Sequence, residues 1–349
     1  MKDILDSEPV RVIDLPKPPV RNRCLDFFKG IAALGVVFVH ITFPGKFGKC
    51  MSAIGSCGII LFFLISGYHA YGDREEICPK LMKRFRRNLL LTLTAIAVYF
   101  AVSYIEHRFF DHDLKIWLRT FTKPAFFLRL LFPCDLEAIH GDPLWFICAL
   151  LGAYLFFWAM HKLRLMRFAK FAMPLLILFR ICMETYKYAA DKDWRFCSNV
   201  FVAAIPLMTL GYCIAESKET CLRIPAAVSA GCGIVSLICL FLLVIYTPFR
   251  WNITQIFKLA AAVSAFLFAM KRPEKRIFPP LCTLGGACSL HVYLWHMPVI
   301  VLLYLYCDRI RHPEYMSTWY MPLIVAAAAV LIAALIVSVS HIFKKQKTA

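Results

Sequence analysis

Residues 25–40 read LDFFKGIAALGVVFVH, a stretch with the apolar character of a membrane-spanning helix and two ionisable side chains, Lys29 and His40. A span needs roughly 20 mostly apolar residues, and this one continues to about residue 43. Lys29 and His40 are eleven residues apart. A helix would place them about 20° apart around its axis and about 16 Å apart along it. The stretch therefore predicts a transmembrane helix that carries a cation and an imidazole on one face.

The composition extends this interpretation to most of the 349 residues. Hydrophobic residues make up 60% of the chain and charged residues 18%, against about 45–50% and about 25% in a soluble domain. These values exclude a disordered chain, a coiled coil and a small disulfide-rich secreted domain. Nine further segments have the length and apolar character of a span, at about 53–72, 89–105, 143–160, 171–186, 199–215, 224–246, 251–270, 281–306 and 320–342. The predicted fold is an all-α polytopic membrane protein with about ten transmembrane helices.

Lys and Arg residues are distributed unequally between alternate loops. One set of loops, which includes 1–24, 73–88 and 343–349, carries 24 of them, and the other set, which includes 106–141, carries 13. Cytoplasmic loops of membrane proteins are enriched in Lys and Arg. We therefore expect both termini to be cytoplasmic and the 106–141 loop to lie outside. The same bias explains the net charge of +18 without a nucleic-acid partner.

The predicted domain organisation has three parts, a cytoplasmic N-terminal segment at 1–24, a ten-helix membrane domain at 25–342 and a cytoplasmic tail at 343–349. The weakest of the ten spans is 171–186, because Arg180 and Glu184 lie inside it. Charged groups within a span are costly and need partners. This segment is therefore the least secure of the predicted spans.

The ninth segment, at about 281–306, carries a second set of polar side chains. Ser289, Tyr293 and His296 follow i, i+4, i+7 spacing and so share one stripe of a helix. His296 comes 15 residues after the start of its segment, as His40 does in the first segment. Both segments begin on the predicted cytoplasmic side, so we expect the two imidazoles at nearly equal depth. Because ionisable groups in a span are costly, these residues are functional candidates.

Each candidate also has a plainer explanation. A histidine in a membrane helix often serves only as an interhelical hydrogen-bonding group, and Lys29 can extend its long side chain to the cytoplasmic interface. The run KLMKRFRR at 80–87 places Arg84 and Arg87 one helical turn apart in the loop after the second segment. Such a run either follows the positive-inside rule or holds the phosphates of a cytosolic donor, which guanidinium groups bind bidentately.

Taken in order, five stretches are similar to motifs of the acyltransferase-3 family of integral membrane acyltransferases. They are the first-helix signature LDFFKGIAALGVVFVH (25–40), LFFLISGY (61–68), RFRR (84–87) as an Arg-x-x-Arg element, PLWFICALL (143–151) and SLHVYLWHMP (289–298). The resemblance covers about 23–345. The sequence departs from the family pattern at Lys29, where arginine is usual. Lysine keeps the positive charge but loses the planar fork of donors.

The resemblance implies a membrane O-acyltransferase, which transfers groups other than aminoacyl groups. Such enzymes move an acyl group, usually acetyl from acetyl-CoA, to a hydroxyl of a carbohydrate or another cell-envelope molecule, such as a polysaccharide. The expected partners are acyl-CoA, this acceptor and the lipid bilayer, and the expected location is the bacterial cytoplasmic membrane. No bound cofactor, metal or nucleic acid is expected. The 15 cysteines contain no CxxC pair and no zinc-site spacing.

For this activity each candidate residue has an expected role. An alcohol is a poor nucleophile at neutral pH and an imidazole is a suitable general base, so His40 is expected to be catalytic. The phosphates of the donor are expected to meet Lys29, Arg84 and Arg87. The supporting or acceptor-side residues are Ser289, Tyr293, His296 and Trp145. Trp145 either stacks on a sugar ring or belongs to the interfacial aromatic belt.

Two alternatives stay open at the level of the sequence. The acyl group passes either directly from acyl-CoA to the acceptor or through a covalent acyl-enzyme. A transporter or substrate-recruiting membrane module without catalysis is the other function to consider. The chain has no repeated half, and its basic run is confined to one side of the membrane. Both features disfavour transport.

Overall fold

The computed structural model describes residues 21–348 apart from 112, 125, 127–134 and 248–252, and these residues form helices and connecting turns without a strand. Most of the predicted 1–24 segment and residue 349 lie outside this range. Every one of the ten predicted spans coincides with a helix. The long helices are α1 (Arg23–His40), α2 (Gly45–Tyr68), α3 (Arg74–Phe109), α6 (Trp145–Lys162), α7 (Ala169–Ala189), α8 (Ile205–Glu216), α10 (Ala226–Tyr246), α11 (Ile253–Lys271), α13 (Ser289–Arg309) and α14 (Met321–Thr348).

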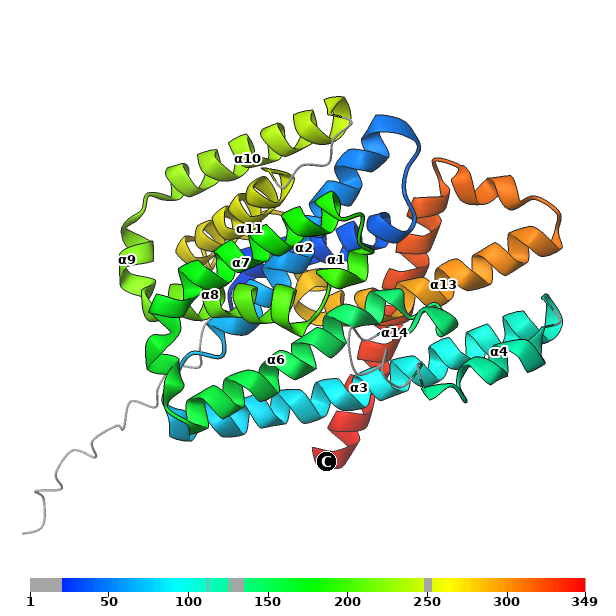
Figure 1. Ribbon diagram of the computed structural model, residues 1–349, viewed down its shortest axis with the longest axis horizontal. Coiled ribbons are helices and arrows are strands. Elements are labelled where there is room, and N and C mark those ends of the chain that lie inside the picture. The colour runs from blue at the N-terminus through cyan, green and yellow to red at the C-terminus, as the bar shows by residue number, and fades with distance from the viewer. Residues whose placement is uncertain (1–20, 112, 125, 127–134, 248–252, 349) are drawn as a thin grey trace, which may run out of the picture.

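Short helical turns connect these helices. They are α4 (Leu114–Thr120), η1 (Glu137–Ile139), η2 (Asp142–Leu144), η3 (Leu165–Phe168), η4 (Trp194–Phe196), η5 (Val200–Ala204), α9 (Lys218–Arg223), α12 (Pro279–Thr283), η6 (Leu284–Cys288) and η7 (Pro313–Ser317). In Figure 1 α3, α6, α10 and α11 run along the molecule, and α14 runs steeply across the direction of α3 in this view.

Seven helices of the described part are long and apolar enough to cross a membrane. They are Gly45–Tyr68, Arg74–Phe109, Asp142–Lys162, Ala226–Tyr246, Ile253–Lys271, Pro279–Arg309 and Met321–Ser340. This result supports an integral, multi-pass membrane protein. The other three predicted spans are α1 and α7, which carry several charged residues, and α8, which is short. The count of ten spans stays a prediction.

The basic run at 80–87 lies on a helix and not in a loop. The predicted loop 73–88 forms the first turns of α3, which begins at Arg74 and continues without a break to Phe109. The rule of about 20 apolar residues marks only the part of a helix within the hydrocarbon. Backbone hydrogen bonds continue beyond it. Arg84 and Arg87 are therefore on one continuous helical surface.

Helix α2 lies at the centre of the membrane domain and packs against α1, α8, α10 and α11 (Figure 1). Its approach to α1 depends on glycine. A Cβ on Gly55 would collide with the carbonyl oxygen of Gly35, and a Cβ on Gly58 would collide with Ala32. Small residues allow the backbones of membrane helices to touch. α1 is thus held directly against α2.

The other side of α1 is packed against η6, a π-helical turn that leads into α13. A Cβ on Gly285 would collide with the carbonyl oxygen of Asp26, and a Cβ on Gly30 would collide with that of Leu281. These backbone contacts leave no room for α1 and α13 to slide along each other. They set the height of α13 relative to α1.

Helix α7 neutralises the charges that made its segment the weakest prediction. Lys187 Nζ donates to Glu184 Oε2 at 2.6 Å, and Arg180 Nη2 lies 3.7 Å from Glu184 Oε1. Arg180 Nη1 also donates to the carbonyl oxygen of Val202 at 3.0 Å. The Glu184 side chain is buried between its two cations. One carboxylate shared by two cations makes the polar residues of α7 compatible with a packed helix.

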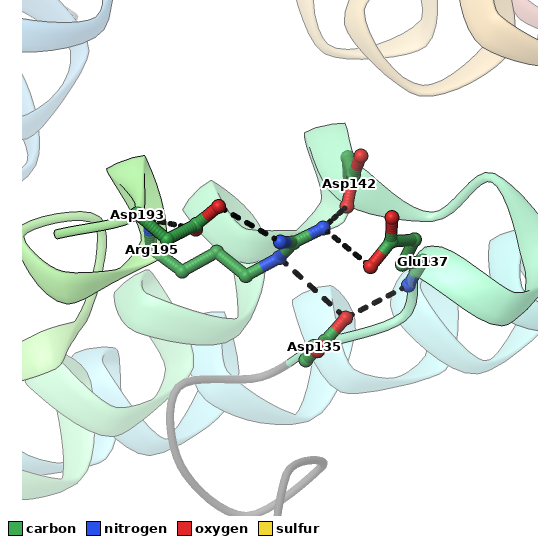
Figure 2. A network of polar contacts seen from close by, with 5 residues as sticks. All are labelled: Asp135, Glu137, Asp142, Asp193 and Arg195. Carbon is green, nitrogen blue, oxygen red and sulfur yellow. Dashed lines mark hydrogen bonds and ion pairs between the residues drawn. The ribbon is translucent and has the colours of Figure 1, made fainter. Parts of the chain in front are cut away.

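An ionic network joins the chain before α6 to the chain after α7. Figure 2 shows the Arg195 guanidinium surrounded by four carboxylates. Its Nη2 lies 3.0 Å from both Asp142 Oδ1 and Glu137 Oε2, and its Nη1 lies 3.3 Å from Asp193 Oδ2. Its Nε lies 3.6 Å from Asp135 Oδ1. The network holds η2, the turn from which α6 begins.

Removal of this guanidinium is expected to destabilise the protein. The substitution Arg195→Gln leaves the four carboxylates facing one another and should lower the free energy of unfolding by about 1–3 kcal/mol. The expected loss of stability is smaller than the loss for a fully buried ion pair, because Glu137 and Asp193 are more than half exposed. Thermal unfolding in detergent measures the loss, with the exposed Arg119→Gln as the matched control. Equal midpoints for the two variants would show that the network is not stabilising.

Candidate active site

His40 and His296 come together from two helices. His40 is the last residue of α1, and His296 lies on the second turn of α13. Their ring centroids are 5.1 Å apart, with an angle of 41° between the ring planes. The predicted equal depth of the two imidazoles is therefore confirmed. The glycine contacts of α1 with η6 provide the physical reason for this register.

The hydrogen bonding of His296 determines which of its ring nitrogens carries the proton and which carries a lone pair. His296 is fully buried, and its Nδ1 lies 2.7 Å from the carbonyl oxygen of Tyr293. A carbonyl oxygen only accepts hydrogen bonds, so Nδ1 carries the proton of the neutral ring and Nε2 presents a lone pair. Among the described residues this buried Nε2 has no hydrogen-bond partner. Buried polar atoms are rarely left in this way, which marks the site as one built for a further interaction.

Ser289 and Tyr293 support α13 from the positions predicted for them. The Ser289 hydroxyl donates to the carbonyl oxygen of Gly285 at 2.9 Å, and the Tyr293 hydroxyl donates to the carbonyl oxygen of Pro143. Both residues are buried. Since Pro143 belongs to η2, Tyr293 ties α13 to the turn that the Arg195 network holds. The two hydroxyl groups therefore anchor the helix that carries His296.

Trp145 lies at the start of α6 in an aromatic cluster. Its ring centroid is 6.2 Å from that of Phe63 and 6.3 Å from that of Phe146. Trp145 is partly buried, and it is not among the described residues that line the cavity beside His40. The structure thus places Trp145 outside the lining of this cavity. Sugar stacking by Trp145 stays a prediction.

A cavity of about 1080 Å³ opens beside the histidine pair. It lies between the α1–α2 connection, the first turns of α2 and α11, and the ends of α7 and α10. Its polar lining includes His40, Lys49, Ser56, Tyr188 and Lys258. His40 is exposed to this space, whereas His296 is fully buried behind it. A molecule in the cavity can therefore reach the imidazole of His40 but not that of His296.

The predicted donor-binding residues gather at the opposite end of α1. Lys29 Nζ lies 3.1 Å from Asp26 Oδ1, and Arg21 Nε lies 2.5 Å from Asp26 Oδ2. Arg84 Nη1 donates to the carbonyl oxygen of His69 at 2.8 Å, and Arg87 is exposed one turn further along α3. Asp26, which the sequence did not single out, therefore holds two of the cations at this end.

The imidazole of His69 is acted on by a cation from α1 and a cation from α3. Desolvation, followed by the positive charges of Arg84 and Lys29, lowers the pKa of His69 to about 4. His69 is thus neutral near pH 7, and its ring adds no charge to the cations around it. Both Arg84 and Arg87 also act electrostatically on the hydroxyl of Tyr154 in α6. Arg84 thus acts on His69 in common with Lys29 and on Tyr154 in common with Arg87.

Several polar residues at these two sites, Asp26, Tyr154 and Lys258 among them, were not proposed from the sequence. Asp26 and Tyr154 lie among the cations, and Lys258 lies in the cavity with His40. Only Lys258 carried a usable signal, since it is an ionisable residue inside a predicted span. Asp26 and Tyr154 acquire their positions through the packing of α1 and α6 against other helices. No spacing within one segment indicates such contacts.

The register of the histidine pair should depend on Gly285. A Cβ at this position would meet the backbone of α1, so Gly285→Ala should push η6 and α13 away from His40. We expect a loss of about 1–3 kcal/mol in stability from overpacking and a decrease in turnover. The equally helical Gly231→Ala, where a Cβ would meet nothing, is the matched control. The measurements are thermal unfolding and turnover of both variants. Wild-type turnover and stability in Gly285→Ala would contradict the expected contact.

Comparison with models of known protein families gives a match over most of the chain. The family model described as an acyltransferase domain, that of the acyltransferase-3 family, aligns with residues 22–341. This range includes both histidines and all three of the predicted donor-binding cations. No curated protein and no solved structure was found to match the chain.

Proposed function

Because the chain belongs to the acyltransferase-3 family across nearly its whole length, we propose that it is a membrane enzyme that moves an acyl group, acetyl in the first instance, from acyl-CoA to a hydroxyl of a carbohydrate or another cell-envelope acceptor. Family membership supports acyltransferase activity and does not favour a transporter. The observation that carries the finer proposal is the pair of His40 and His296 beside a large cavity.

His40 acts as the general base in this proposal. The acceptor hydroxyl oxygen attacks the thioester carbonyl carbon while its proton moves to the imidazole of His40. The tetrahedral intermediate then collapses, the carbon–sulfur bond breaks, and the imidazolium returns the proton to the CoA thiolate. A positioned general base contributes about 10²–10⁴-fold to such a reaction. The exposure of His40 to the cavity supports this role.

His296 acts as a positioning residue. Its Nε2 lone pair can accept the N–H of the His40 ring, which leaves the second nitrogen of His40 with a lone pair toward the acceptor. Because Nδ1 of His296 donates to the Tyr293 carbonyl oxygen, Nε2 is the nitrogen of His296 that can accept this hydrogen bond. Such orientation of a catalytic imidazole by a second group recurs in hydrolases. The buried, unpartnered Nε2 of His296 supports the arrangement.

The donor approaches from the side of Lys29 on α1 and of Arg84 and Arg87 on α3. We take this side as cytoplasmic because its loops carry 24 Lys and Arg residues against 13 on the other side. About 16 Å of helix separates Lys29 from His40. In this proposal the pantetheine arm of acyl-CoA spans this distance and carries the acyl group to His40. The bacterial cytoplasmic membrane follows as the proposed location.

Direct transfer is the simpler of the two routes for the acyl group. A covalent relay needs a nucleophile near the histidine pair. Ser289 and Tyr293 are the hydroxyl-bearing residues on the His296 stripe, and both donate to backbone carbonyl oxygens. These bonds anchor α13 and do not present the hydroxyl groups to the cavity. They support transfer without an acyl-enzyme on Ser289 or Tyr293.

An assay with the purified protein tests the proposed function. The protein in detergent is incubated with radiolabelled acetyl-CoA, alone and with envelope glycans, and release of the CoA thiol is followed. We expect glycans to accelerate thiol release and to take up label that mild base removes, as an O-ester requires. Succinyl-CoA in parallel tests the choice of acyl group. Absence of thiol release under all these conditions would refute the proposal.

A further inference from the structure

Lys258 occupies an unusual place for a cation. It lies on the second turn of α11, where this helix packs against α2 around Ala53, Cys57 and Ala261. Its side chain lines the same cavity as His40. An ionisable group within a span is rare unless it pairs with another group or faces a cavity. The position of Lys258 therefore raises the question of what neutralises its charge.

The residues that the structure describes give Lys258 no ion-pair partner. None of the described residues that line the cavity is acidic. Glu184 is the carboxylate that acts electrostatically on Lys258. It already accepts from Lys187 at 2.6 Å and lies 3.7 Å from Arg180. Glu184 is thus already paired, and the described wall of the cavity carries Lys49 and Lys258 without an acidic residue.

The opposite wall of the cavity is polar as well. Lys49, Ser52 and Ser56 follow i, i+3, i+7 spacing along α2 and all line the cavity. Ser52 donates to the carbonyl oxygen of Phe38 at 3.1 Å, and Ser56 donates to that of Ser52 at 3.0 Å. Their oxygens can still accept hydrogen bonds. The cavity therefore offers cations and hydroxyl groups in a volume of about 1080 Å³, enough for a sugar-sized group.

We propose that the cavity selects acceptors that carry an anionic group, a carboxylate or a phosphate, and that Lys258 is the cation that receives this group. The inference rests on the proposed acyl transfer, since it places the anionic group in the same cavity as the base, His40. A charged acceptor pairs with Lys258 while its hydroxyl reaches the imidazole. A neutral acceptor leaves the lysine without a partner. The acceptor class is then an acidic glycan or a phosphorylated one.

Binding of simple probes tests this inference without acyl transfer. The protein in phosphatidylcholine nanodiscs is titrated calorimetrically with methyl β-glucuronide, glucose 6-phosphate and neutral methyl β-glucoside. We expect the wild type to bind at least one anionic probe roughly 10-fold or more tightly than the neutral probe. Lys258→Met should abolish this preference, and Lys258→Arg should retain it. Comparison of the two anionic probes distinguishes a carboxylate from a phosphate.

The matched control is Lys46→Met. Lys46 is also a lysine at this end of the helices, but its ammonium lies 5.1 Å from the centre of the Tyr246 ring and it does not line the cavity. Its substitution should leave the preference for anionic probes unchanged. If Lys258→Met does not fold, Lys258→Gln, which keeps a polar side chain without the charge, replaces it. An equal loss in Lys46→Met would show that the effect is not specific to the cavity.

A lipid headgroup could provide the same phosphate chemistry. The titration is therefore repeated in nanodiscs that contain phosphatidylglycerol. Unchanged binding of the anionic probe supports the assignment to the acceptor. Competition by the lipid would assign Lys258 to a headgroup and overturn the inference about the acceptor. Equal affinity of the wild type for all three probes, or an unaltered preference in Lys258→Met, would overturn it as well.

Failure of this inference is distinct from failure of the proposed function. The binding experiment uses no acyl donor, so its result does not depend on catalysis. If acetyl-CoA is not turned over, the acyltransferase proposal fails whatever the probes show. If acetyl-CoA is turned over but the preference for anionic probes does not depend on Lys258, only the inference about the acceptor fails.

Discussion

Substitution of His40 by alanine is expected to lower kcat for acyl transfer by roughly 10²–10⁴-fold, the contribution of a positioned general base. The acceptor hydroxyl then has no nearby group to take its proton, because His296 is buried behind His40 and does not face the cavity. Donor affinity should be unchanged, since the cations at the other end of α1 are untouched. Steady-state turnover and direct binding of acetyl-CoA measure the two effects.

Three controls separate catalysis from folding. His40→Gln keeps a hydrogen-bonding group but cannot accept the proton, and it should be as inactive as the alanine variant. His296→Ala should reduce turnover less, because His40 remains but loses its orientation. His291→Ala changes a partly buried histidine of the same helix and should retain activity. Near-normal turnover in a folded His40→Ala protein would exclude His40 as the base.

The second large effect is expected at the donor site. If Arg84 and Arg87 hold the phosphates of acyl-CoA, replacement of either by alanine should weaken donor binding by about 1.5–3 kcal/mol, the range for charge-assisted hydrogen bonds. This corresponds to a rise of roughly 10- to 150-fold in Kd. Turnover at saturating donor should change much less. These arginines hold the donor equally in the ground state and in the transition state, so their loss raises KM and leaves kcat nearly unchanged. Calorimetric titration with acetyl-CoA gives Kd directly.

Arg86 provides the matched control for this experiment. It lies between the two arginines on α3 and is exposed, but it points about 100° away from Arg87 around the helix. Arg86→Ala should leave donor affinity unchanged. Lys29→Arg restores the residue that is usual in the family and should preserve or improve affinity if position 29 meets an anion. Unchanged Kd in Arg84→Ala and Arg87→Ala would assign these residues to the positive-inside pattern alone.

The sequence predicted the helices well and their ends less well. Each of the ten segments is a helix, because an apolar stretch in lipid satisfies its backbone hydrogen bonds only in this form. The starts of α2 and α3 lie earlier than predicted, at Gly45 and Arg74. Both early turns contain lysine or arginine, which lower the hydropathy below that of a span although the helix is continuous. The same effect placed the predicted donor-binding arginines in a loop.

The histidine pair could be predicted from the sequence, but the cavity could not. His40 and His296 each lie 15 residues from the start of a predicted span, and the depth of a residue in a straight helix follows from such a count. The neighbours of Lys258 come from α1, α2, α7 and α10. Which helices are adjacent depends on interhelical packing, such as the glycine contacts of α1. A single sequence does not specify that packing.

The backbone contacts of α1 also have a consequence for motion. α1 touches α2 at Gly35 and Gly55, and it touches η6 at Gly30 and Gly285. By contrast, only three of the 21 residues of α10 are buried. Local opening of a protein begins where few buried contacts must be broken. We therefore expect the helix that ends in His40 to fluctuate less than α10, which forms part of the cavity wall. An acceptor would then reach a stationary base by displacing a mobile wall from the lipid side.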